Sequence, residues 1–373
     1  MTSATPAATA ALADAVGGYA ARFHAAVGAR HHVASPLGAW LLLALVGGPA
    51  ETLGMAAADA VRHARQLLDD PHPAVASATA AWTRDAPPAA AGWLAGLPAA
   101  VARGPVPTQE EADAWARDHT LGMIEHFPLT VDHEVLCVLA NALATRISWT
   151  HPFTTTKSNA FRSAWRERVR TVLRTPEKGH ECGVARHAAA GLVGVHRARA
   201  AEGLAVTSVI AAPDVPAGVV LAAAHDAARE RIEPVPLGEL PLGDGPAWSV
   251  VESRGTGDRV SAVLPAWSAT SEHDLSAPAF GFDEAGEILR RLFGAAGWDA
   301  AQAATARYHR EGFEAAAVTA VAVRMSFRPP GRRREAELRF DRPYAVVATA
   351  TGEGPWAGLP VFSAWVTDPA DAD

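Results

Sequence analysis

The segment from Glu311 to Ala320 is the feature that most narrows what this chain of 373 residues can form. Strand alternation from Phe313 onward places small or β-branched side chains on one face, namely Ala315, Ala317, Thr319 and Val321. A strand can enter an already packed sheet only if its inward side chains are small, because protein interiors are as dense as organic crystals. The same segment is less polar than an ordinary exposed loop. We therefore interpret it as an element with two states, an exposed loop and an inserted strand.

Composition excludes several classes of protein. Lys plus Arg number 33 and Asp plus Glu number 40, and the resulting net charge of −7 argues against a general nucleic-acid binder. The most apolar run, Trp40 to Val46, is too short to span a bilayer, so we expect a soluble protein with no membrane partner. Met1 to Ala11 lacks the features of a secretory signal, which predicts a cytoplasmic location, with export by another route as the alternative. Cys137 and Cys182 form no disulfide framework, and whether they pair stays open.

Hydrophobic periodicity predicts helices early in the chain and strands late, which is an α+β arrangement. We expect a buried helix after the Ser35-Pro36 cap, ending at Gly47-Gly48, and a later helix opened by a capping box of Thr108 and Glu111. The helices are expected at 11–27, 37–46 and 112–126, and loop-interrupted helix is expected between 73 and 107. The strands are expected at 135–143, as a central strand buried on both faces, and at 165–173, 205–211, 219–223, 248–252, 260–264, 304–309, 344–350 and 361–366.

Further short segments, in chain order, carry a family resemblance that reaches from the first helices to the last strand. They are the runs at 33–37, 113–115, 138–143 with Trp149 beyond it, 264–268, and 340–344 followed by 361–369. With the segment from Glu311 to Ala320 they resemble the serpin family, as a divergent member of the bacterial type. The resemblance implies an α+β serpin fold with N-terminal helices on a large mixed or antiparallel main sheet, plus smaller sheets. It also implies one domain over residues 1–373 and an exposed reactive-centre loop at about 310–338.

The serpin mechanism is what this resemblance implies for function. A target protease attacks the exposed loop and forms an acyl-enzyme, and the cut loop then inserts into the main sheet before hydrolysis finishes. The inhibitor supplies no catalytic group, so we expect a protein that is not an enzyme and that has no metal and no cofactor. Its expected partner is a serine or cysteine protease, and it is expected to be a monomer.

The resemblance also assigns the loop residues by position. The expected hinge consists of Glu311, Gly312, Phe313, Glu314, Ala315, Ala316, Ala317, Val318 and Thr319. The family's usual spacing from Gly312 places the attacked bond at Ser326-Phe327, with a slip of one residue as the alternative. Arg324, Met325 and Arg328 flank this bond and are expected to influence specificity. Ser326 suggests an elastase- or subtilisin-like protease, whereas a slip to Phe327 suggests a chymotrypsin-like one.

Several residues depart from the family pattern. Phe313 stands where inhibitory members usually carry Thr or Ser, and an overpacked benzyl group in the sheet would cost about 1–3 kcal/mol. Arg310 replaces the acidic residue that usually opens the hinge, and His31, Gly38 and Gln302 differ from the family where its main sheet opens. Two functions therefore stay open, an inhibitor that inserts its loop and a non-inhibitory serpin-fold protein that binds a partner or ligand.

Two arginine clusters have a functional and a plain interpretation. Arg166, Arg168 and Arg170 alternate along an expected strand, where a solvated face is favoured over a polyanion site. The run Arg332 to Arg334 lies in an inserted stretch, where we favour a solvated loop over a protease-docking patch or a second cleavage site. The sequence has no GxSxG elbow, P-loop or HExxH motif, and the histidines and cysteine at 180–187 match no standard zinc spacing.

Overall fold

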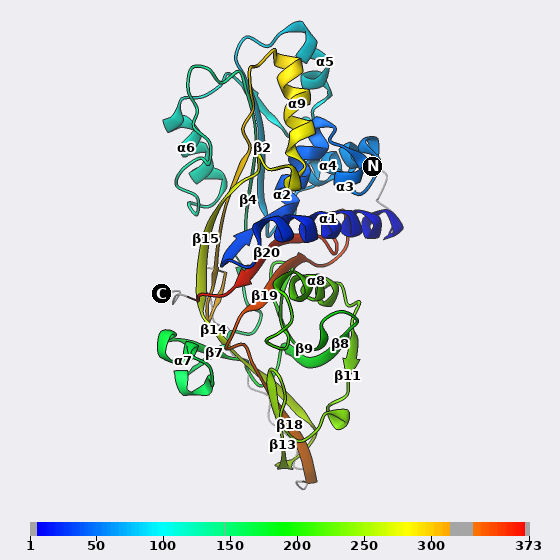
Figure 1. The fold of residues 1–373 in the computed structure, drawn as a ribbon, viewed down its shortest axis with the longest axis vertical. Helices are drawn as coiled ribbons and strands as arrows, with labels where there is room; N and C mark the ends of the chain where they lie inside the picture. Colours follow the sequence, from blue (N-terminus) through cyan, green and yellow to red (C-terminus); the bar gives the residue numbers. More distant parts are fainter. Residues whose placement is uncertain (1–5, 146, 314–330, 370–373) are drawn as a thin grey trace.

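The computed structural model describes residues 6–145, 147–313 and 331–369, and Figure 1 shows their elongated arrangement. The described α-helices are α1 (Pro6–Val27), α2 (Pro36–Val46), α3 (Ala50–Leu53), α4 (Ala57–Asp69), α5 (Pro88–Gly96), α6 (Gln109–His119), α7 (Trp165–Arg168), α8 (Ala217–Ala228) and α9 (Phe282–Phe293). No helix among them is long and apolar enough to cross a membrane.

The strands form several sheets. Their bounds are β1 (His32–Ala34), β2 (Ala76–Thr83), β3 (Ala102–Gly104), β4 (Cys137–Ala144), β5 (Ile147–Ser148), β6 (Thr154–Thr156), β7 (Val172–Arg174), β8 (His180–His187), β9 (Gly191–Arg199), β10 (Leu204–Ile210), β11 (Glu233–Val235), β12 (Gly243–Asp244), β13 (Trp248–Gly255), β14 (Arg259–Pro265), β15 (Trp267–Asp274), β16 (Ala301–Tyr308), β17 (Gly312–Phe313), β18 (Gly331–Arg339), β19 (Tyr344–Ala350) and β20 (Pro360–Val366). The expected α+β class with a large antiparallel sheet and smaller sheets is confirmed.

The sheets divide into groups by strand order. A seven-stranded antiparallel sheet has the order β1-β20-β19-β10-β9-β8-β11, and a six-stranded sheet has the order β12-β13-β18-β14-β7-β6. In the six-stranded sheet β18 runs antiparallel to β13 and parallel to β14. Three further pieces are β3-β2-β4, β15-β16 and the short pair β17-β5. The paired strands β2 and β4 rise above the crossing helix α1 in Figure 1, and β15 also lies largely in this upper half of the view.

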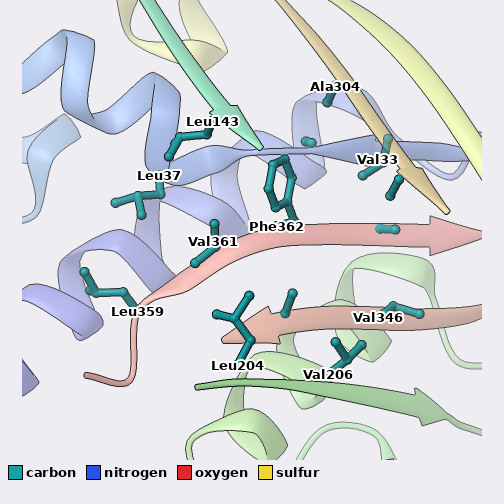
Figure 2. Packing of buried hydrophobic residues seen from close by; sticks show 14 of the residues in the cluster. Val33, Leu37, Leu143, Leu204, Val206, Ala304, Val346, Leu359, Val361 and Phe362 are labelled. Atoms are coloured by element: carbon teal, nitrogen blue, oxygen red, sulfur yellow. The ribbon is translucent and has the colours of Figure 1, made fainter. Parts of the chain in front are cut away.

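Helix α2 is the buried helix that the sequence predicted. Its N-cap Ser35 accepts a hydrogen bond from the Gly38 amide at 3.3 Å, and its C-cap Gly47 has a left-handed backbone with φ +84°. The helix lies in the main core with Leu37 beside Val361 of β20, and Figure 2 also shows Leu143 of β4 and Ala304 of β16 in this cluster. Because α2 is apolar all round, only a position between several layers can bury it.

The expected helix at 112–126 ends early. Its capping box of Thr108 and Glu111 is confirmed, but α6 stops at His119. The Thr120 hydroxyl donates to the Ala116 carbonyl at 2.7 Å, and Leu121 then takes a left-handed backbone with φ +56°. A side chain that bonds the previous turn, followed by a left-handed residue, ends the helix although its apolar periodicity continues.

The expected strand at 165–173 is wrong except at its last two residues, Val172 and Leu173, which begin β7, and its first four residues form the single helical turn α7. The Asp341 carboxylate accepts from the Ser163 amide at 3.1 Å, and the Ser163 hydroxyl accepts from the Trp165 amide at 3.1 Å. This distant carboxylate sets the turn, so a tertiary contact overrides the alternating pattern. The arginines at 166–170 therefore do not line one face of a strand, and Arg168 forms an ion pair with Asp368.

Three other expectations also need correction. Residues 219–223 lie in α8, because the Ala-rich continuation to Ala228 extends the run to helical length and its apolar face packs on β10 and β19. The stretch 73–107 contains the strand β2 as well as the helix α5. Strand β4 is not buried on both faces throughout: Cys137, Leu139 and Asn141 are only half-buried, since β4 pairs only with β2 among the described strands.

The run Arg332 to Arg334 is not a solvated loop. It lies in β18, whose residues from Gly331 onward pair with β13. Within it, the Arg334 guanidinium lies within hydrogen-bond distance of the Leu237, Gly238 and Leu240 carbonyls, at 3.1, 2.7 and 2.9 Å. These carbonyls come from a segment that no local pattern links to Arg334.

Candidate functional site

The expected hinge begins shortly after the end of β16, the strand that pairs with β15. Gly312 and Phe313 form β17, which pairs antiparallel with Ser148 and Ile147 of β5. Before them, the Trp149 amide donates to the Glu311 carbonyl at 3.0 Å. The first residues of the expected hinge therefore already have strand conformation, against a segment that follows β4.

Two more hydrogen bonds, from the segment that follows β5, hold the residues between β16 and β17. The Phe153 amide donates to the Arg310 carbonyl at 2.9 Å, and the Trp149 indole donates to the His309 carbonyl at 2.9 Å. The Arg310 side chain is exposed and forms no ion pair with another described residue. Arg310 thus takes part through its backbone, and its cationic group lies outside this pairing.

Gly312 is required by the close approach of β17 to β5. A β carbon on residue 312 would overlap the Ile147 carbonyl oxygen and lie 2.9 Å from the Ser148 Cα. Gly312 also has φ +156°, a conformation that side chains rarely adopt. Glycine is the residue that fits this position without moving one of the strands.

The two long edges beside this hinge do not pair with each other in the described residues. Strand β4 pairs only with β2, and β16 pairs only with β15. Both strands nevertheless touch the start of α2, because Gln302 of β16 bonds Ser35 while Asn141 of β4 lies against Gly38. Strands β4 and β16 therefore both reach the start of α2 without pairing with each other in the described residues, and we call the interval between them the split; β17, which follows β16, pairs with β5, which follows β4.

Gln302 and Gly38, two of the residues that differ from the serpin pattern, both lie at the start of α2. Gln302 accepts from the Ser35 amide at 3.0 Å and donates to the Ser35 carbonyl at 2.8 Å. Asn141 donates to the Thr79 hydroxyl at 2.9 Å, but its buried Oδ1 has no partner among the described residues. A β carbon on Gly38 would lie 2.9 Å from that oxygen. Gly38 thus leaves room for the Asn141 Oδ1, although this oxygen accepts no hydrogen bond from a described residue.

The departure at His31 lies in a different place. His31 accepts from the Thr367 amide at 3.1 Å through Nδ1, just after the end of β20. It therefore holds the last strand in place and does not share the contacts of Gln302.

An aromatic cluster with one buried histidine, His196, and one half-buried histidine, His180, lies beside the hinge. The ring of Phe153 lies 6.0 Å from Trp149 and 4.5 Å from His180, measured between centroids. His180 Nδ1 lies 3.0 Å from His196 Nε2. Burial lowers the pKa of His180 to about 4 and lowers the pKa of His196 well below 6.5, because the charged imidazolium loses its hydration. Both histidines are therefore neutral at pH 7, which lets them pack against Phe153.

Comparison with known proteins was made by sequence and by structure. No protein-family model matches the sequence, and no curated protein matches it significantly. Tengpin, a thermophilic serpin in its native state, is 13% identical over 98% of this chain and 95% of its own, with a TM-score of 0.63. Serpin48 of the insect Tenebrio molitor is 14% identical over 95% of this chain and 97% of its own, with a TM-score of 0.57.

The chain has the serpin fold. Human thyroxine-binding globulin, in complex with thyroxine, is similar as well, with 15% identity over 98% of this chain and 99% of its own and a TM-score of 0.63. Serpin folds thus cover nearly the whole chain, and at these identities they establish its fold alone. The expected bacterial type stays a prediction.

Only the first part of the expected site lies in the described residues. Arg310 to Phe313 are placed as stated above. The remaining residues lie outside the described residues and stay predictions: Glu314, Ala315, Ala316, Ala317, Val318, Thr319, Arg324, Met325, Ser326, Phe327 and Arg328.

The sequence missed the partners that hold the hinge. Ile147 and Ser148 contribute backbone groups, which no residue pattern signals. His180 stands out in the sequence only within the group at 180–187, which matches no zinc spacing, and His196 is a histidine inside the largely apolar strand β9. Only the fold brings both rings to Phe153.

Proposed function

We propose that this protein is a serine-type endopeptidase inhibitor that acts as a suicide substrate, through cleavage near Ser326-Phe327 and insertion of its loop into the main sheet. The observation that carries the proposal is the pairing of β17 with β5 at the end of the split between β4 and β16. The chain that enters the loop is already a strand there. Insertion would extend this strand and would not require a new one to nucleate.

The loop sequence is long enough to supply a strand that fills the split. At about 3.3 Å per residue, the segment from Glu314 to Ser326 would span about 43 Å, compared with about 26 Å for β16. The facing edges of β4 and β16 carry backbone groups that an inserted strand can bond, because neither pairs with the other in the described residues. The small residues Ala315, Ala317 and Thr319 suit the inward face of that strand.

The two ends of the loop are held with different strength, which supports movement of one side only. Strand β17 is two residues long and pairs with one neighbour. Strand β18 pairs with β13 from Gly331 to Leu338 and also pairs with β14. A cut between them would let the hinge side extend into the sheet while the other side stays in place.

The chemistry on the inhibitor is limited to one peptide bond. The protease hydroxyl would attack the Ser326 carbonyl carbon, forming an ester while the amine of Phe327 leaves with a proton. Insertion would then carry the esterified protease away from the departed amine and deform its active site before water completes hydrolysis. Because the stored folding energy does this work, the proposal needs no metal, cofactor or catalytic side chain of the inhibitor.

A panel of serine and cysteine proteases tests the proposal. At least one protease is expected to give a covalent complex stable in SDS, and mass determination of the released fragment identifies the attacked bond. The cut chain is also expected to unfold at a markedly higher temperature than the intact chain. If every active protease only cuts the loop and turns over, this function is wrong.

A hollow near the end of α8 favours a second candidate function, a non-inhibitory protein that binds a small anion. The hollow has a volume of about 260 Å³, and its lining includes Thr349, Glu230 and two arginines, Arg199 and Arg229, which also form ion pairs with Glu181 and Asp14. Thr349 is 4% exposed, and its hydroxyl has no partner among the described residues. A buried hydroxyl without a partner costs about 1–3 kcal/mol, which a bound ligand would offset.

Calorimetric titration distinguishes this second function from the first. Thyroxine is the first probe, because a protein of the same fold binds it and because it carries a carboxylate. Binding that is lost in Arg199→Ala, together with a cut loop that leaves the unfolding temperature unchanged, would favour the binding protein. Inorganic phosphate serves as the control anion, and no heat with either probe would exclude this candidate.

A further inference from the structure

A two-stranded ribbon projects from the end of the six-stranded sheet. It consists of Glu252–Gly255 of β13 and Gly331–Arg334 of β18, and we call it the β13–β18 ribbon. It forms the lower end of the molecule in Figure 1, opposite the end that carries α5. Because the ribbon lies beyond the body of the sheet, its side chains contribute little to the core.

The end of the ribbon carries an unfavourable pair of like charges. Arg254 and Arg332 are directly opposite each other in the strand register. The Arg332 side chain is 88% exposed, and its ion pair with Glu252 is long, at 3.7 Å. Arg254 is exposed and has no ion pair with any described residue. Like charges directly opposite each other destabilise a strand pair, so this arrangement does not serve the stability of the ribbon.

The two neighbouring arginines, Arg333 and Arg334, have partners within the protein, unlike Arg254. Arg333 pairs with Glu335, and its Nε lies 3.0 Å from the Ser253 hydroxyl. Arg334 binds the carbonyls described above. Of the arginines on the ribbon, Arg254 has no ion pair among the described residues and Arg332 has only the long one to Glu252, so these two charges are the most available to a partner.

The ribbon is close to the expected cleavage site along the chain. From Ser326 to Gly331, even a fully extended chain reaches at most about 18 Å. A standard protein interface buries about 800 Å² on each partner, which is a patch about 30 Å across. A protease on the bond at Ser326-Phe327 therefore lies within contact range of the ribbon, on the side of the residues that follow the bond.

We infer that Arg254 and Arg332 form a second contact surface for the target protease, and that this surface fits a protease with acidic side chains beside the primed side of its cleft. The inference rests on the proposed function, because it needs a protease that attacks this loop. The charge complementarity acts on the encounter, since exposed opposite charges raise association rates that salt then lowers. The ribbon therefore governs how fast the loop is attacked, while the hinge governs what happens after the attack.

The test compares two subtilisin-like proteases that share a cleavage preference and differ in surface charge, one acidic and one basic. For each protease, mass spectrometry measures the rate constant of loop attack, and gel electrophoresis measures the fraction that becomes covalent complex. The chains are the wild type, the double variant Arg254→Glu/Arg332→Glu, and Arg62→Glu. Arg62 is an exposed arginine on α4, a helix in the opposite half of the molecule (Figure 1). Arg332→Glu alone places opposite charges across the strands, and its unfolding temperature is expected not to fall, which keeps a folded variant in the test.

For the acidic protease, the double variant is expected to lower the attack rate about tenfold at low salt and to flatten its salt dependence. The basic protease is expected to attack the double variant at least as fast as the wild type, and Arg62→Glu is expected to behave as the wild type. An unchanged attack rate and salt dependence with the acidic protease would overturn the inference. Loop attack without covalent complex would contradict the proposed function and still measure the ribbon, whereas no attack by either protease would overturn both.

Discussion

Gly312 lies directly against the Ile147 carbonyl, where a β carbon would overlap the oxygen. This approach lets β17 pair with β5 and keeps the start of the expected hinge on the main sheet. A glycine at this position therefore has a structural reason that is independent of any resemblance.

Gly312→Ala is expected to detach β17 from β5 and to cost about 1–3 kcal/mol, because residue 312 would have to leave its present backbone conformation. Hydrogen exchange provides the local measurement: the Trp149 and Phe153 amides, which bond the carbonyls of 311 and 310, should exchange faster. Gly18→Ala in α1 is the matched control, because a β carbon there meets nothing within 4 Å. Unchanged protection at both amides would show that the close approach does not constrain the hinge.

Phe313→Thr is expected to speed loop insertion, because it removes a large side chain from a position that should face the packed sheet. If the whole overpacking cost of about 1–3 kcal/mol lies in the insertion step, that step becomes about 5- to 160-fold faster. The measurement is the number of inhibitor molecules consumed per protease inactivated, which should fall. Phe313→Leu keeps most of the bulk and should change little, and an equal effect of both variants would argue against a steric cause.

The histidines under the hinge predict that stability falls in acid. Burial lowers the folded-state pKa of His180 to about 4, while an unfolded chain has a value near 6.5, so the unfolded state binds more protons between these values. Stability is therefore fully present above about pH 6.5 and is lost as the pH falls toward 4. His180→Gln should reduce this slope by up to about 1.4 kcal/mol per pH unit in urea unfolding.

The matched control is His133→Gln, which makes the same substitution at an exposed histidine outside this cluster. Other buried histidines with a lowered pKa, such as His24 and His225, contribute to the acid loss in both chains. The difference between the two variants therefore isolates the pair below Phe153. Equal slopes for His180→Gln and the wild type would contradict the role of burial at this position.

Arg334→Ala and Arg332→Ala should differ in their effect on stability, although the two arginines are only two residues apart on the same strand. Arg334 satisfies carbonyls of the segment 237–240, so its loss should cost about 1–3 kcal/mol in chemical unfolding. Arg332 is exposed, and its loss should change stability by less than about 0.5 kcal/mol. Similar costs for both variants would mean that the carbonyl contacts of Arg334 contribute little.

Much of the fold could be predicted where one local pattern and one burial environment agree. The expected strand at 344–350 matches β19 residue for residue, and the cap at Ser35 begins α2 as expected. The capping box at Thr108 is also present. In these places the conformation that the local sequence favours is also the one that the tertiary structure buries.

Predictions failed where a distant group decides between local alternatives. Asp341 bonds the backbone at Ser163 and turns the following residues into α7. The β-branched residues Val219 and Val220 lie in a helix because its apolar face is buried on β10 and β19. Local propensity differs by only a fraction of a kcal/mol per residue, so such contacts override it.

The sequence by itself determined that a segment with small alternating side chains follows Gly312 and that it resembles a serpin hinge. Only the tertiary structure decided what Gly312 meets, which is Ile147 of a strand that lies far away in the chain. The Trp149 indole reaches the carbonyl of His309 across 160 residues in the same region. The reason is physical: side-chain periodicity encodes which face of a strand is buried, whereas strand pairing is made by backbone groups that every residue carries alike.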